Sequence, residues 1–192
     1  MIKINKFEGK AGLKKLGKVL DKRRYSQDKE IFIVSKILKD IKKNKNKAVL
    51  KYEKKFSNNN KIKATQSEIK HAIKSLNPKI KKAIDFAYNR ILNYHKLQKV
   101  KNIYYKDKLN NHIQYKSVPI DKVGVYVPAN LPSTLLMNAI PAKIAGVKNI
   151  ILANPRQNKK LNPAVIYAAK KLGINEIYSI GGAQAIGSLT YI

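Results

Sequence analysis

A glycine-rich segment near the C-terminal end of the chain contains one of two residues that could bind a ligand. The segment reads Gly181-Gly182-Ala183-Gln184-Ala185 and lies between an apolar run and a helical pattern. Glycines let a ligand approach the backbone, and free N–H groups at a helix start favour phosphate or another anion. The spacing differs from the G-x-G-x-x-G fingerprint of dinucleotide-binding proteins, so a tight strand-to-helix turn explains it equally well. Gln184, in the first turn, could donate or accept a hydrogen bond to a ligand.

A tyrosine at the end of another apolar run is the second candidate. Tyr126 directly precedes Val127-Pro128. A tyrosine ring in a buried strand usually belongs to the core, and the pattern alone favours that interpretation. Its position at the carboxyl end of the expected strand allows another, in which the hydroxyl group bonds to a bound ligand. Tyr126 and Gln184 are therefore the two candidate binding residues.

The histidines of this chain do not indicate a metal site. His71, His95 and His112 are not joined by an H-x-x-x-H spacing, and no acidic cluster accompanies them. The chain has no cysteine, which excludes thiolate ligands, disulfide bonds and a cysteine nucleophile. It also lacks a nucleophile elbow, a P-loop and a convincing acid–base pair of carboxylates. We therefore expect a binding crevice with no metal ligand and no catalytic residue.

The candidate residues follow short apolar runs that alternate with helical patterns. These runs are rich in Val, Ile and Tyr and too short for helices: Val123–Val127, Asn149–Ala153 and Glu176–Ile180. Strands that alternate with helices predict βαβ units and an α/β fold with a parallel sheet covered on both faces. Ligands of such sheets bind beyond the carboxyl ends of the strands. The expected site therefore comprises residues 126–133, 153–156 and 181–185.

The rest of the chain predicts a helical module and a hairpin that precede this sheet. Residues 1–102 form the helical module, with an arm or short helix at 1–24 and breaks at Asn44–Asn46 and Ser57–Asn60. Residues 103–120 form a linking β-hairpin, and residues 121–192 form the first βαβαβα part of a Rossmann-like domain. The last helical pattern reaches Ile192 without a stop signal, so we expect either a fragment or a reading frame that ended early.

The charge of the chain is its most extreme property. The formal net charge is +30, yet only four of the 41 basic residues are arginines. Lysine, asparagine and isoleucine are encoded by AT-rich codons, so coding bias could produce this charge. Proteins that read DNA bases directly usually use arginine for bidentate contacts, and this chain has few arginines. We therefore favour solvated lysine faces, with a basic nucleic-acid-binding module or a non-catalytic partner-binding remnant as alternatives. No signal peptide and no apolar run long enough to cross a membrane is visible, so we expect a cytoplasmic protein.

Four blocks of the C-terminal part resemble the histidinol dehydrogenase family. They occur in the family's order and with nearly its spacing: Val123–Pro128, Pro132–Met137, Ile140–Val147 and Gly181–Ile186. The helix pattern at Ala83–Gln98 is similar to the family more loosely. One departure is the turn after Pro128, where Ala129-Asn130 replaces a longer glycine-rich loop.

The resemblance implies an activity and two cofactors. Members of the family are zinc-dependent homodimers that oxidise L-histidinol to L-histidine through histidinaldehyde, in two steps that reduce NAD. Tyr126 and Gln184 match family positions that contact NAD, so the resemblance implies cofactor-binding roles for both. The zinc ligands, the substrate-binding residues and the Glu-His acid–base pair of the family lie beyond residue 192. We therefore expect the 192-residue chain alone to be inactive.

Overall fold

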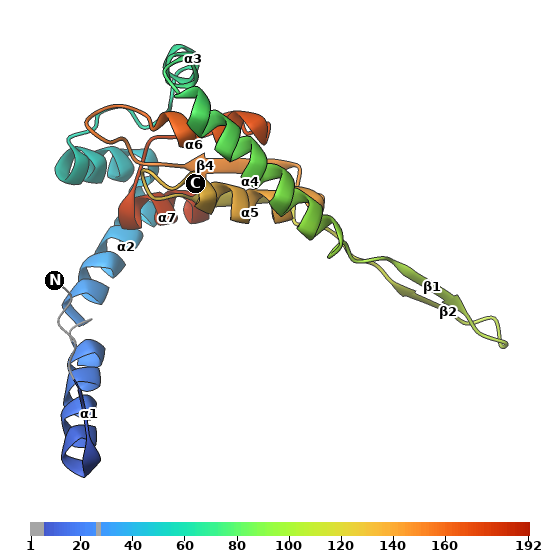
Figure 1. The fold of residues 1–192 in the computed structure, drawn as a ribbon, viewed down its shortest axis with the longest axis horizontal. Helices are drawn as coiled ribbons and strands as arrows, with labels where there is room; N and C mark the ends of the chain where they lie inside the picture. The colour runs from blue at the N-terminus through green and yellow to red at the C-terminus, as the bar shows by residue number, and fades with distance from the viewer. Residues whose placement is uncertain (1–5, 26–27) are drawn as a thin grey trace.

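The structure is a computed structural model that describes residues 6–25 and 28–192 (Figure 1). Helices precede the sheet along the chain, and strands and helices then alternate. The elements are α1 (Gly9–Tyr25), α2 (Asp28–Ser57), α3 (Gln66–Lys74), α4 (Pro78–Lys96), β1 (Ile103–Lys106), β2 (His112–Tyr115), β3 (Lys122–Tyr126), α5 (Pro132–Ile144), β4 (Asn149–Ala153), α6 (Pro163–Lys171), β5 (Glu176–Tyr178) and α7 (Gly182–Tyr191). This order confirms the predicted α/β class.

Strands β3, β4 and β5 form a parallel sheet in the order β3-β4-β5. The register pairs Tyr126 with Ala153 and Ala153 with Tyr178, so the carboxyl ends of the three strands meet at one edge. Strand β4 has the predicted bounds, whereas β5 ends two residues earlier than predicted. It ends because Ser179 N donates to Ile62 O at 2.7 Å, outside the parallel sheet.

Helices cover both faces of this sheet. Alternate strand residues point to opposite faces, as the period of two in a strand requires. Val125, Leu152 and Ile177 belong to a core shared with α5 and α6, against which α3 and α4 pack. Tyr126, Ala153 and Tyr178 belong to a second core, shared with α2 and α7. The predicted coverage of both faces is thus confirmed.

The helices before the sheet begin and break where local sequence signals place them. Thr65 and Glu68 form a capping box at the start of α3, and Pro78 occupies the first turn of α4. Within α2, Lys45 leaves the helical conformation with φ 49° and ψ −132°. This interruption confirms the break predicted at Asn44–Asn46. No helix in the described part of the chain combines the length and apolar character needed to cross a membrane.

A hairpin projects from the compact part of the molecule, and a second segment contacts the outer edge of the parallel sheet. Strands β1 and β2 form the predicted antiparallel hairpin, which projects from the body with all its strand residues exposed (Figure 1). Asn110 supplies the left-handed turn residue with φ 67°. At the outer edge of β5, Lys63 makes an antiparallel bridge to Tyr178, and Ala64 N donates to Ile177 O at 3.0 Å. The sequence pattern did not predict this edge contact.

Candidate functional site

The carboxyl ends of the strands bring the first sequence candidate next to the glycine-rich turn. Tyr126, the last residue of β3, is half-buried, and its hydroxyl accepts a hydrogen bond from Gly182 N at 3.4 Å. Gly182 has a φ of 59°, a conformation that glycine adopts without strain. The ring is therefore part of the core beneath α7, while its hydroxyl lies beside the start of that helix. The core interpretation therefore holds for the ring, and the ligand-binding interpretation of the hydroxyl stays a prediction.

Gln184, the second candidate, is held by an acidic residue from the other end of the chain. Its side chain is buried in the first turn of α7, and its Nε2 donates to Glu53 Oε1 at 2.9 Å. Gly181 N, at the cap position of α7, donates to the same oxygen at 2.9 Å. Glu53 lies in α2, so the helical module reaches directly into the turn that carries Gln184.

Glu53 is a buried carboxylate whose partners are neutral donors. Its residue is 1% exposed, and Asn59 Nδ2 lies 3.5 Å from its Oε2. Asn59 also donates to Ser179 O at 2.7 Å, which ties this cluster to the residue after β5. Among the described residues, no lysine or arginine forms an ion pair with Glu53. Its negative charge is stabilised by N–H donors and by the positive end of the α7 dipole.

This arrangement changes the interpretation of the glycine-rich turn. The sequence left two interpretations open, a tight strand-to-helix turn and a site for phosphate or another anion, and the second assumed that the N–H groups at this helix start are free. Gly181 N instead donates to the carboxylate of Glu53. A negative group of the protein therefore already lies at this helix start, and a phosphate placed there would meet like charge. The turn suits a neutral hydrogen-bonding group, such as a hydroxyl or a carboxamide.

Asn154 fixes the short turn that follows Tyr126. It is fully buried just after β4, and its Nδ2 lies 3.0 Å from Val127 O, 3.2 Å from Pro128 O and 3.4 Å from Ala129 O. Its Oδ1 is buried without a hydrogen-bond partner in the described part of the chain. The Asn154 side chain thus holds the backbone of residues 127–129 at the carboxyl edge, and its Oδ1 is left as a buried acceptor.

Arg156 and Glu68 connect the same edge to α3. Arg156 Nη1 lies 2.9 Å from Glu68 Oε1, and its Nη2 donates to Oε2 at 3.2 Å, so the pair is bidentate. The hydrogen bond from Arg156 lowers the pKa of Glu68 from 4.5 to about 2, with further help from Thr65. A cavity of about 880 Å³ lies beside this pair, between α3 and the loop that leads to α6.

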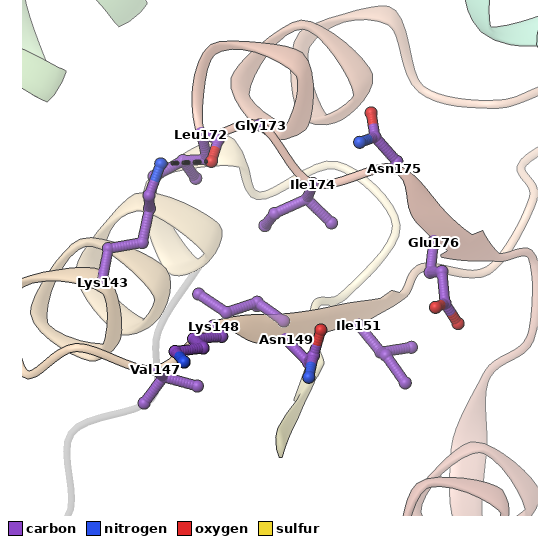
Figure 2. Close-up of a pocket in the computed structure, with 11 residues that line it drawn as sticks. Lys143, Val147, Lys148, Asn149, Ile151, Leu172, Gly173, Ile174, Asn175 and Glu176 are labelled. Atoms are coloured by element: carbon purple, nitrogen blue, oxygen red, sulfur yellow. Dashed lines mark hydrogen bonds between the residues drawn. The ribbon is translucent and has the colours of Figure 1, made fainter. Parts of the chain in front are cut away.

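A different cavity lies at the opposite end of the strands (Figure 2). It has a volume of about 220 Å³ and is lined by the residues at which β4 and β5 begin, Asn149 and Glu176. Lys143 Nζ, on its wall, donates to Leu172 O at 2.7 Å. Because ligands of open parallel sheets bind at the carboxyl ends, this cavity at the amino ends is not the candidate site.

The described residues do not fit a zinc ion. They contain no group of three or more His, Cys, Asp or Glu side chains that could hold a metal. His71 lies on α3, His95 on α4 and His112 on β2, so the structure does not bring the histidines together. The site does offer neutral hydrogen-bonding groups. The Tyr126 hydroxyl and the Gln184 amide lie at one helix start, where they could bond to hydroxyl or amide groups.

Sequence reasoning missed the roles of Glu53 and Asn154. Glu53 lies four residues after Val49, so it shares the buried face of its helix in spite of its charge. That spacing was the available signal. Asn154 directly follows a buried strand in the segment expected to line the site, and its polar side chain there was the corresponding signal.

The fold and this geometry define an open parallel α/β protein with a candidate ligand site at the carboxyl edge of its sheet. The family model described as histidinol dehydrogenase matches residues 20–192. The chain belongs to the histidinol dehydrogenase family, as the four sequence blocks predicted.

Individual relatives and a solved structure agree with this assignment. The histidinol dehydrogenase of Pelagibacter ubique (strain HTCC1062) is 52% identical over 194 aligned residues, which cover 100% of this chain and 45% of the relative. That of Acinetobacter baylyi is 39% identical, with 82% of this chain and 39% of the relative covered. The crystal structure of the enzyme from Elizabethkingia anophelis matches with a TM-score of 0.77 and 36% identity, covering 83% of this chain and 38% of that one. The chain thus spans less than half the length of these relatives.

Proposed function

We propose that this chain provides the NAD-contacting part of a histidinol dehydrogenase that oxidises L-histidinol to L-histidine through histidinaldehyde. Membership of the family supports the oxidoreductase class and the small-molecule substrate. The observation that carries the assignment of the site is the meeting of Tyr126 with the start of α7, where Gly182 N donates to its hydroxyl. The two side chains that the resemblance links to NAD therefore meet at the start of α7, Tyr126 from the end of β3 and Gln184 from the first turn of the helix.

In the proposed reaction, the residues of this site bind the cofactor and orient it. NAD, when bound, accepts the hydride from the substrate carbon. The Tyr126 hydroxyl and the Gln184 side chain hydrogen-bond to neutral groups of the cofactor and fix its position against the carboxyl edge. Asn154 holds the turn after Tyr126 through Val127 O and Pro128 O, so this wall of the site is rigid before the cofactor arrives.

A zinc requirement and homodimer assembly belong to the same proposal. Because the described residues do not fit zinc, no step of the reaction is assigned to a metal held by them. We propose that zinc is bound by residues that the longer relatives contain outside the segment this chain matches. The catalytic acid–base groups belong to that part as well, and the 192-residue chain alone is therefore expected to form no NADH from L-histidinol.

A chimeric enzyme tests this function. Residues 1–192 replace the matching segment of the Pelagibacter ubique relative, and NADH formation from L-histidinol is followed by absorbance at 340 nm. The proposal predicts activity in the chimera and about a tenfold higher KM for NAD in its Tyr126→Phe variant, the size of one lost hydrogen bond. Tyr104→Phe is the matched control, because Tyr104 is an exposed hairpin residue. A folded chimera without activity would contradict the proposed function.

A further inference from the structure

The buried carboxylate of Glu53 has a place in the proposed site that neither the sequence pattern nor the family resemblance assigned. It lies in α2, 128 residues before Gly181 and 131 before Gln184, and one of its oxygens accepts from both. A carboxylate buried without an ion pair is costly unless its donors are well placed. This carboxylate therefore stabilises one arrangement of the turn between β5 and α7.

The carboxylate also decides which way the Gln184 amide faces. An ionised carboxylate only accepts hydrogen bonds, so the NH₂ group of Gln184 must point toward Glu53. Gln184 Oε1 is then directed to the other side, where a Cβ added to Gly182 would lie 3.1 Å from it. The buried polar atoms without partners in the described residues are Asn154 Oδ1 and Arg156 Nε. Gln184 Oε1 accepts no hydrogen bond within the described residues and is not among these fully buried atoms, so it keeps contact with solvent and is open to a donor group of a ligand.

We propose that Glu53 is a positioning residue for the cofactor site, an inference that rests on the proposed function. It orients Gln184 so that Oε1 accepts a hydrogen bond from a neutral N–H or O–H group of NAD, such as the carboxamide or a ribose hydroxyl. It also occupies the N-terminus of α7 with the protein's own negative charge, so the pyrophosphate of the cofactor lies away from this helix start. The helical module thereby controls cofactor affinity through one side chain.

The test measures NAD affinity and the state of the Gln184 amide in the full 192-residue chain. NAD is titrated into the unaltered chain and the Glu53→Ala, Glu53→Gln, Gln184→Ala and Glu53→Ala/Gln184→Ala variants. Binding is followed by ¹H–¹⁵N NMR, which also records the side-chain NH₂ signals of Gln184. The matched control is Lys54→Ala, an exposed neighbour on α2.

The positioning role predicts about a tenfold weaker Kd in Glu53→Ala and a smaller loss in Glu53→Gln, which keeps a weaker neutral acceptor. In the Gln184→Ala background, removal of Glu53 should change Kd less than twofold. The Gln184 NH₂ signals should move toward those of a free amide in Glu53→Ala, whereas Lys54→Ala should change nothing. Should Glu53→Ala fail to fold, Glu53→Gln gives the same comparison.

Two outcomes overturn different parts of the account. Unchanged Kd values and unchanged Gln184 signals in the folded Glu53 variants would overturn the positioning role and leave the proposed function standing. The same would follow if Glu53→Ala weakened NAD equally with and without Gln184, since its effect would then be merely structural. Absence of NAD binding to the unaltered chain would overturn the NAD site of the proposed function, and the positioning role with it.

Discussion

The ion pair at the edge of the candidate site makes a quantitative prediction. Glu68→Gln leaves the shape of the capping residue nearly unchanged but removes the charge that faces Arg156. The Arg156 side chain is 7% exposed and that of Glu68 is 28% exposed, so solvent screens the pair only in part. The pKa of Glu68 falls from 4.5 to about 2, and 1.36 kcal/mol per pKa unit makes this shift worth about 3 kcal/mol. We expect Glu68→Gln to lower the free energy of unfolding by about 3 kcal/mol at pH 7.

The same pair predicts how the loss depends on pH. The pKa of Glu68 is lower in the folded chain than in the unfolded one, because Arg156 hydrogen-bonds to the ionised form. Its contribution to stability is therefore complete above about pH 4.5 and disappears as the pH falls toward 2. The unfolding free energies of the unaltered chain and of Glu68→Gln should converge across this range.

Urea unfolding followed by circular dichroism between pH 2 and pH 7 measures both quantities. Glu176→Gln is the matched control, because it neutralises an exposed carboxylate that forms no ion pair among the described residues. Its stability should stay within about 0.5 kcal/mol of the unaltered chain. A Glu68→Gln variant as stable as the unaltered chain at pH 7 would refute the reasoning. So would a stability difference that persists unchanged at pH 2.

Three further predictions concern other contacts of the sheet. Gly124→Ala should lower stability by about 1–3 kcal/mol in urea unfolding, since its Cβ would lie 2.7 Å from Leu189 Cδ2. Burial, together with the hydrogen bond to Asp85, raises the pKa of Tyr167 to about 12, so an ultraviolet titration should show a late tyrosine signal that Tyr167→Phe removes. Asn154→Asp should lower stability by about 2 kcal/mol and weaken NAD binding, because a carboxylate would face three carbonyl oxygens.

Each of these three predictions has a control or a result that would contradict it. Gly17→Ala is the control for Gly124→Ala, because a Cβ at Gly17 meets nothing within 4 Å; equal effects of the two changes would contradict the close packing. For Tyr167, the folded state is favoured below about pH 10 and loses this contribution as the pH approaches 12. A titration curve unchanged by Tyr167→Phe would contradict the shifted pKa. An Asn154→Asp variant with unaltered stability would show that the turn does not depend on this clamp.

Local patterns were sufficient to predict most elements of this fold. The short Val-, Ile- and Tyr-rich runs predicted β3, β4 and β5, because buried parallel strands read as continuous apolar runs. The run Asn44–Asn46 marked the interruption of α2 at Lys45. Each of these features depends on residues close together in the chain, which is why the sequence displays them.

The contacts that define the site were not predictable in the same way. Glu53 meets Gln184 across 131 positions, and Arg156 meets Glu68 across 88. Such pairs depend on how α2 and α3 pack against the sheet, and no local spacing records that packing. The assumption of free N–H groups at Gly181 was wrong for this reason, because the carboxylate that accepts from it comes from a distant helix.

The most direct test of the central claim is to map NAD binding on the ¹⁵N-labelled chain by NMR. The account predicts chemical-shift changes at Tyr126, Gly182 and Gln184, which gather at the carboxyl edge of the sheet. It predicts no changes at Asn149 and Glu176, which line the cavity at the amino ends of β4 and β5. Changes concentrated around Asn149 and Glu176, with Tyr126 and Gln184 unaffected, would contradict the proposed cofactor site.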